Sequence, residues 1–191
     1  MLVVSVAILY YTFMIEFYQH LAPALSYRVM HLFTSFCILA LCYGFRKRFP
    51  VKEYGFLYVI GIGISVILYM IHTWEDHGNS IGVLPVLLSW ITTVVIIVNL
   101  CYVCWLYTIH HSITVRFTVY FSVLSTLFWL AIVRLFLSHL GLPDEFNAGL
   151  SIALGIAGFV QMSLGMRLHQ KVLRIISLFT LGIVLVKLVL V

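Results

Sequence analysis

Charged residues are the scarcest class in this chain of 191 residues, and their scarcity argues against a water-soluble domain. Only 9% of the residues are charged, whereas 63% are hydrophobic. A soluble domain carries about a quarter charged residues, because it must cover its surface with them. Lipid is therefore the expected solvent for most of these side chains.

Cysteines in outward loops are also lacking. The four cysteines, Cys37, Cys42, Cys101 and Cys104, all fall inside apolar runs, so no disulfide framework is indicated. Cys101 and Cys104 form a CxxC pair, but no second pair completes a ligand set, and we interpret them as packing residues. The formal charge of +5 comes from short basic caps between apolar runs, which argues against nucleic acid as a partner.

Continuous apolar runs recur along the chain, and each is near the roughly 20 residues that cross a bilayer as one helix. The alternation typical of a β-barrel is missing. The pattern predicts an all-α, polytopic transmembrane bundle of about seven helices in a single domain, residues 1–191. The predicted helices cover 2–20, 27–45, 54–71, 81–109, 115–139, 146–165 and 171–191, with a turn over 20–26 and a polar loop over 72–80.

Basic residues are distributed unequally between the two ends of these helices. The connections after the second, fourth and sixth helices hold Arg46, Lys47, Arg48, Lys52, Arg116, Arg167, Lys171 and Arg174. The opposite connections hold Arg28 and the acids Glu75, Asp76, Asp144 and Glu145. The positive-inside rule predicts that the basic side and the N-terminus are cytoplasmic and that Val191 is outside.

The C-terminal region carries four short motifs. In chain order they are Asn-Ala-Gly-Leu-Ser at 147–151, Leu-Gly-Met-Arg at 164–167, Val-Leu-Arg-Ile at 172–175 and Val-Lys-Leu at 186–188. This region resembles the last two helices of a bacterial family of large polytopic membrane proteins, domain of unknown function 2339. That family shows a small-residue helix ending in Leu-Gly-x-Arg, a basic turn with Leu-Arg, and a helix with Lys-Leu near its end.

Members of that family are usually much longer, and an Asp follows their Lys-Leu stretch. The resemblance implies a multi-pass protein of the bacterial inner (plasma) membrane, of which this chain is a fragment, and it implies no catalytic activity.

Three charged residues, Glu16, Arg134 and Lys187, fall inside predicted helices, where ionisable groups are costly and raise a functional question. They lie roughly 7, 9 and 8 Å outward of their helix midpoints, at 1.5 Å per residue. At one depth they could form an intramembrane cluster of net positive charge, suited to an anionic ligand or lipid headgroup. The favoured alternative is that Lys187 and Arg134 snorkel to the outer interface while Glu16 hydrogen-bonds a neighbour.

Histidines and acids gather at the predicted outer face, and Glu16 and His20 share one helix face at a spacing of four. Imidazole and carboxylate suit a zinc-type ion. No HExxH or HxxxH pair occurs, so interfacial hydrogen bonding is favoured over a metal site. The weak metal candidates are His20, His72, His77 and His139.

Small residues at three- and four-residue spacing predict a surface for close helix packing, made by Ala148, Ser151, Gly155 and Gly158. Asn99 and Gln161 are single amides in apolar helices, and we expect them to form interhelical hydrogen bonds.

No nucleophile elbow or phosphate loop occurs in the sequence. This favours a non-enzymatic module without a cofactor, a scaffold or pathway in a larger assembly, in contact with membrane lipids and with other subunits or upstream helices. Two alternatives stay open. One is a transporter of a small anionic or lipidic solute with a site at Glu16, Arg134 and Lys187; the other is an intramembrane metal-dependent enzyme using outer His and acid groups.

Overall fold

The computed structural model describes residues 2–21, 23–44, 51–75, 83–109, 115–140, 146–167 and 169–190. Seven helices and no strand occur in these ranges, which confirms the predicted all-α class. The helices are α1 (Leu2–His20), α2 (Pro23–Gly44), α3 (Val51–Glu75), α4 (Val83–Ile109), α5 (Val115–His139), α6 (Phe146–Arg167) and α7 (Lys171–Leu190).

Within the described ranges, four segments are long and apolar enough to cross a membrane by length and composition, namely Leu25–Gly44, Val83–Ile109, Arg116–His139 and Asn147–Arg167. A shorter apolar segment, Gly55–Ile71, lies within α3. The predicted helix boundaries are close to the observed ones, except at the start of α2 and the end of α3.

The predicted turn over 20–26 is wrong, because α2 already begins at Pro23. Proline is favoured in the first helical position, where its missing N–H has no intrahelical partner to lose. The predicted loop over 72–80 is likewise wrong at its start, since α3 continues to Glu75. Residues 76–80 lie outside the described part of the chain.

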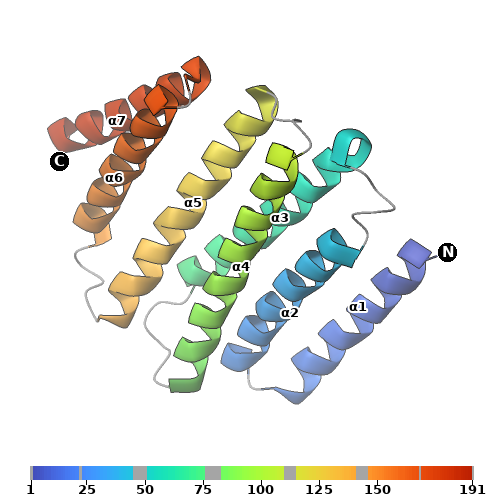
Figure 1. Ribbon diagram of the computed structural model, residues 1–191. Helices are drawn as coiled ribbons and strands as arrows, with labels where there is room; N and C mark the ends of the chain where they lie inside the picture. Colours follow the sequence, from blue (N-terminus) through green and yellow to red (C-terminus); the bar gives the residue numbers. More distant parts are fainter. Residues whose placement is uncertain are drawn as a thin grey trace.

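The helices run alternately up and down (Figure 1). One end of the bundle therefore holds the starts of α2, α4 and α6, and we call it the Arg28 end; the other end holds the turn between α6 and α7. The centre is formed by α2 to α5, in which α2 packs on α3 and α4, and α5 packs on α3 and α4. On one flank α1 contacts α2 alone, and on the other α6 and α7 pack on each other and on α5.

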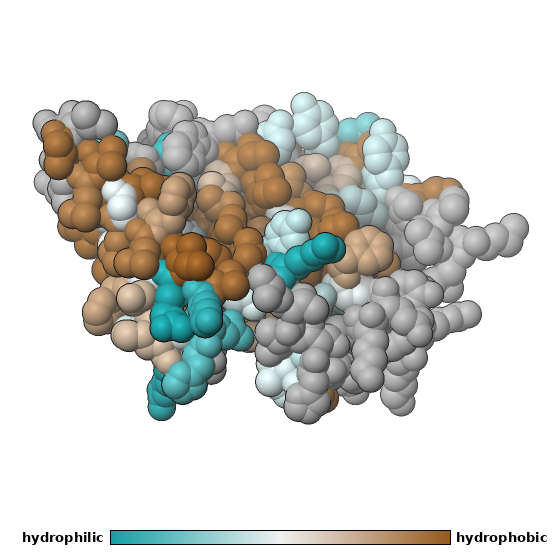
Figure 2. All heavy atoms as spheres, turned by 90° about the horizontal axis from the view of Figure 1, so that it is seen from above, coloured by the Kyte–Doolittle hydropathy of each residue, from teal (hydrophilic) through white to brown (hydrophobic). Residues whose placement is uncertain are grey.

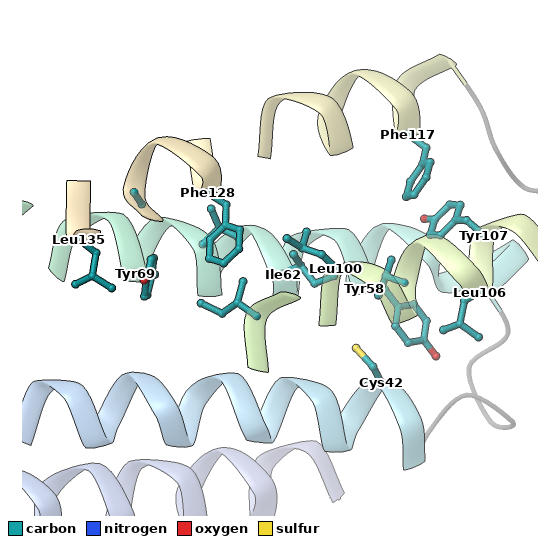
Figure 3. Close-up of a cluster of buried hydrophobic side chains, with 14 residues drawn as sticks. Cys42, Tyr58, Ile62, Tyr69, Leu100, Leu106, Tyr107, Phe117, Phe128 and Leu135 are labelled. Carbon is teal, nitrogen blue, oxygen red and sulfur yellow. The ribbon is translucent and has the colours of Figure 1, made fainter. Parts of the chain in front are cut away.

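The largest group of buried apolar side chains lies between the four central helices (Figure 3). Cys42 of α2 points toward Tyr58 of α3, and further along the bundle Tyr69 and Phe128 bring their ring centroids to 5.5 Å. At the end of α4, Tyr107 stacks on Phe117 of α5 with centroids 3.8 Å apart. Aromatic contacts thus join α3 and α4 to α5.

Many large apolar side chains are exposed on the outside of the bundle, and apolar atoms cover much of the coloured face seen in Figure 2. Large apolar side chains are exposed on every helix, including Phe159, Phe179 and Val189, which is 84% exposed. Many Ser and Thr side chains are instead buried. This distribution is the reverse of what a water-soluble monomer needs, because such proteins rarely expose large contiguous apolar patches.

Close packing of α6 depends on three glycines. A Cβ at Gly158 would lie 2.9 Å from Cγ of Leu181, and one at Gly165 would lie 2.9 Å from Cγ of Arg174, so both positions face α7. These two glycines are seven residues apart, which is about two helical turns. Gly149 faces α5 instead.

The sequence pattern misplaced part of this packing surface. A Cβ added at Gly155 would have no neighbouring atom within 4 Å, and Ala148 is exposed. Ser151 donates its hydroxyl to the Asn147 carbonyl of its own helix. Of the four residues in the predicted surface, Gly158 makes the close approach, because the direction in which α7 crosses α6 selects the contact positions and spacing alone does not.

Gly158→Val is expected to destabilise the bundle by about 1–3 kcal/mol, because the added methyl groups must displace Leu181. Gly155→Val places the same side chain in open space on the same helix and is the matched control. Thermal unfolding in detergent measures both. Equal destabilisation by the two variants would contradict the proposed packing of α6 on α7.

Candidate functional site: a buried polar seam across the central helices

A set of buried hydrogen bonds joins α2, α3 and α4 near their middles. The hydroxyls of Ser35 and Ser65 lie 2.8 Å apart, and Nδ2 of Asn99 donates to the Ser35 carbonyl at 3.0 Å. All three residues are buried. The expectation that Asn99 forms an interhelical hydrogen bond is confirmed, and we refer to these contacts and their continuation below as the polar seam.

The seam continues toward the Arg28 end. The hydroxyl of Tyr69 on α3 forms a short hydrogen bond with Thr93 on α4, and Thr93 in turn donates to the Ser89 carbonyl. On the other side of α2, Tyr10 of α1 and Thr34 place their hydroxyl oxygens 2.6 Å apart. The polar groups therefore form a series of hydrogen bonds that links α1 to α4.

Arg28 lies beyond these hydrogen bonds, toward the start of α2, and is only 2% exposed. It precedes Ser35 by seven residues on α2, while Thr73 follows Ser65 by eight on the antiparallel α3. At 1.5 Å per residue, both therefore lie about 10–12 Å from the Ser35–Ser65 contact, toward the same end. Arg28 thus lies on α2 at the level of the last turns of α3.

Arg134 reaches the same level from α5. Its Nε donates to the Thr73 carbonyl at 2.9 Å, and its side chain is partly buried. One turn further along α5, the ring of His139 packs against Trp90 of α4 with centroids 6.2 Å apart. Two arginines therefore lie at one level of the bundle, on α2 and α5, which both contact α3.

The predicted cluster of Glu16, Arg134 and Lys187 is not assembled in the structure. Glu16 is exposed on α1 and pairs with His20 at 3.2 Å, and α1 contacts α2 alone. Nζ of Lys187 donates to the Asn147 carbonyl at 2.8 Å and so fastens the end of α7 to α6. Arg134 and Lys187 lie on helices that contact each other, α5 and α7, but Lys187 bonds to α6 and Glu16 lies on α1, which contacts neither of them.

The histidine candidates are also spread over the fold. His20 bonds to Glu16, His139 lies beside Trp90, and His72 belongs to the last turns of α3. His77 lies outside the described residues. Within the ranges that the structure describes, no three His, Cys, Asp or Glu side chains come together to hold a metal ion.

Gln161, the second buried amide, also forms an interhelical hydrogen bond, which confirms the prediction for this residue. Nε2 of Gln161 on α6 donates to the Thr126 hydroxyl of α5 at 2.6 Å, with a longer contact of 3.4 Å to the Ser122 carbonyl. Nε1 of Trp129 donates to the Ala153 carbonyl at 3.0 Å across the same pair of helices. These bonds position α6 against α5 away from the polar seam.

Arg28 is the functional candidate that sequence reasoning missed. The predicted turn over 20–26 places Arg28 at an outer connection. Pro23 is the signal that could have found it, since Pro in the first helical position places Arg28 in the second turn of α2. Burial then follows from the tertiary packing of α2 on α3 and α4.

The chemistry available in the seam is that of hydrogen-bond donors. Guanidinium, amide and hydroxyl groups recognise carboxylates, phosphates and other anions, and guanidinium does so in a bidentate manner. The described residues of α2, α4 and α5 include no Asp or Glu, whereas α3 carries Glu53 in its first turn and Glu75 in its last turn, at the level of Arg28 and Arg134. The donor groups suit an anion, and the two arginines outnumber the one acid that the described parts of these four helices place at that level.

Comparisons with protein families, curated proteins and solved structures find no match for this chain. The resemblance of its C-terminal region to domain of unknown function 2339, and the bacterial origin that it implies, stay predictions.

Asn99→Ala is expected to lower the free energy of unfolding by about 1–2 kcal/mol, because it removes an interhelical hydrogen bond in an apolar interior. Thr108→Ala is the control, since Thr108 is exposed on the same helix and donates to the Cys104 carbonyl of its own helix. Denaturant titration in mixed micelles measures the difference. A loss of stability as large for Thr108→Ala as for Asn99→Ala would count against the seam.

Proposed function

We propose that this chain is a multi-pass membrane protein whose four central helices form a binding pathway for a small anionic solute. Membrane insertion is supported by the exposed apolar side chains on every helix and by the polar side chains buried between helices. Four segments of spanning length support the same conclusion.

The orientation follows from the distribution of basic residues. The connections at the end of the α6–α7 turn are rich in Lys and Arg, and such connections stay in the cytoplasm. The N-terminus is then cytoplasmic, the Arg28 end faces outward, and the protein belongs to the inner (plasma) membrane of a bacterium. Membrane lipids and further membrane subunits are its expected partners.

The observation that carries the pathway is the burial of Arg28 inside an apolar helix. Ionisable groups inside a membrane are expensive, and they mark solute or ion pathways by default. Arg134 adds a second cation at the same depth through its bond to Thr73. A solute with a carboxylate or phosphate group would find the second N–H of the Asn99 amide further along the seam, since one N–H of that amide donates to the Ser35 carbonyl.

The competing function is a scaffold that binds no solute. The two functions differ in the role that they assign to Arg28. In a scaffold, Arg28 contributes only to stability, and any variant that folds is fully functional. In a pathway, Arg28→Gln removes the charge that binds the solute even when the fold is retained.

Uptake of radiolabelled phosphate, sulfate and acetate into proteoliposomes tests the pathway. The wild-type chain is expected to exceed empty liposomes for at least one of these anions. Arg28→Gln is expected to reduce that uptake by about tenfold or more, because a hydrogen bond to a charged group contributes about 1.5–3 kcal/mol.

Arg28→Lys and Lys187→Gln are the controls. Arg28→Lys keeps the charge, so it is expected to retain part of the uptake, and Lys187→Gln removes a cation outside the central helices and leaves uptake unchanged. Thermal unfolding verifies that each variant is folded. No uptake by the wild-type chain, or undiminished uptake by a folded Arg28→Gln variant, would exclude the pathway.

The orientation has its own test. Lys171→Cys, in a chain whose native cysteines are replaced by serine, is expected to react with a membrane-impermeant maleimide only after the cytoplasmic membrane is opened. Asn147→Cys on the other end of α6 is expected to react in intact spheroplasts. The reverse pattern of labelling would invert the proposed topology.

A further inference from the structure

The turn between α6 and α7 has a defined backbone geometry that brings three basic residues together. The amide of His169 donates to the Met166 carbonyl at 3.3 Å, and that of Gln170 donates to the Gly165 carbonyl at 3.0 Å. His169 has a φ of 53°, the left-handed conformation with which many helices end. The chain therefore reverses within a few residues, with Arg167 just before the turn and Lys171 just after it.

Gly165 allows the first turn of α7 to lie directly on α6. A Cβ at this position would lie 3.0 Å from the Arg174 backbone nitrogen and 2.9 Å from its Cγ. The stem of Arg174 thus crosses the helix at Gly165, and its Nε is buried without a hydrogen-bond partner among the described residues. The third basic side chain is held close to the turn by this packing.

The positive charge of this turn is not neutralised by its surroundings. No Asp or Glu occurs between residues 146 and 191. Within the described chain, α5 is the only other helix that contacts α6 or α7. Residues 115–140 contain no acid either, and Arg116 adds a further cation at the same end of the bundle.

Exposed apolar side chains lie directly below the basic residues on the same two helices. Met166 is 53% exposed, and on α7 Ile175, Leu178 and Phe179 are all more than half exposed. Figure 2, which is viewed from this end, shows hydrophilic atoms gathered on the side of α6 and α7 with apolar surface beside them. A lipid has the same arrangement, with a charged headgroup above its acyl chains.

We propose that Arg167, Lys171 and Arg174 bind the phosphate headgroup of an anionic lipid, whose acyl chains pack against the exposed apolar side chains of α6 and α7. Basic residues next to membrane helices attract anionic headgroups. The continuous apolar surface below the charges favours a lipid over a free anion, which would gain nothing from it. This inference rests on the membrane insertion proposed above and is independent of the anion pathway at Arg28.

Lipid titration of the full chain in dodecyl maltoside micelles, measured by native mass spectrometry, tests the site. Phosphatidylglycerol is expected to bind more tightly than phosphatidylcholine. Lys171→Gln and Arg174→Gln are each expected to weaken phosphatidylglycerol binding about fivefold, which corresponds to about 1 kcal/mol per basic residue at an anionic membrane surface. Phosphatidylcholine binding is expected to stay the same.

Lys187→Gln is the matched control, because it removes one positive charge from the other end of α7. It is expected to leave phosphatidylglycerol binding unchanged, and Lys171→Arg is expected to retain it. If Arg174→Gln does not fold, as judged by thermal unfolding, Lys171→Gln carries the test, since Lys171 is exposed.

Three results would overturn the lipid site. The first is equal binding of the two lipids, the second is an equal loss on Lys187→Gln, and the third is displacement of phosphatidylglycerol by inorganic phosphate, which indicates a site for a free anion.

Carbonate extraction of cell membranes separates this inference from its premise. Release of the protein by carbonate contradicts membrane insertion, whereas loss of lipid selectivity in a carbonate-resistant protein contradicts only the headgroup site.

Discussion

Hydrogen bonding in apolar surroundings is the constraint on which the rest of this structure depends. A polar group that faces hydrocarbon finds no water, so it must find its partner within the protein. Most Ser and Thr hydroxyls satisfy this need within their own helix, as Thr92 does at the Leu88 carbonyl. The few that bond to another helix, such as Ser35 with Ser65, determine which helix faces meet.

The same constraint explains why charge is arranged differently at the two ends of the bundle. At the Arg28 end, guanidinium groups on α2 and α5 are drawn into the protein, where Arg134 bonds to a backbone carbonyl of α3. At the α6–α7 turn, Arg167 and Lys171 remain on the surface. A cation inside the bundle suits a solute that enters the protein, whereas cations at the rim suit a headgroup that stays in the membrane.

The prediction of helices succeeded because the length of an apolar run is a local property. All seven predicted helices overlap those of the structure. The wrong predictions concern residues whose structural role depends on the residues around them. Pro23 begins a helix where a turn was predicted, and Glu16, predicted to cluster with Arg134, lies on α1, which among the described helices packs on α2 alone.

Composition and the spacing of apolar runs by themselves determined the helical class, the number of helices and the apolar solvent expected around them, because each of these follows from segments of about 20 residues read one at a time. Only the tertiary structure decided which polar groups meet. Arg134 and Thr73 are 61 residues apart in the chain, and Asn99 and Ser35 are 64 apart. Such contacts depend on how every helix is rotated about its axis, and that rotation is set by packing against all neighbouring helices at once.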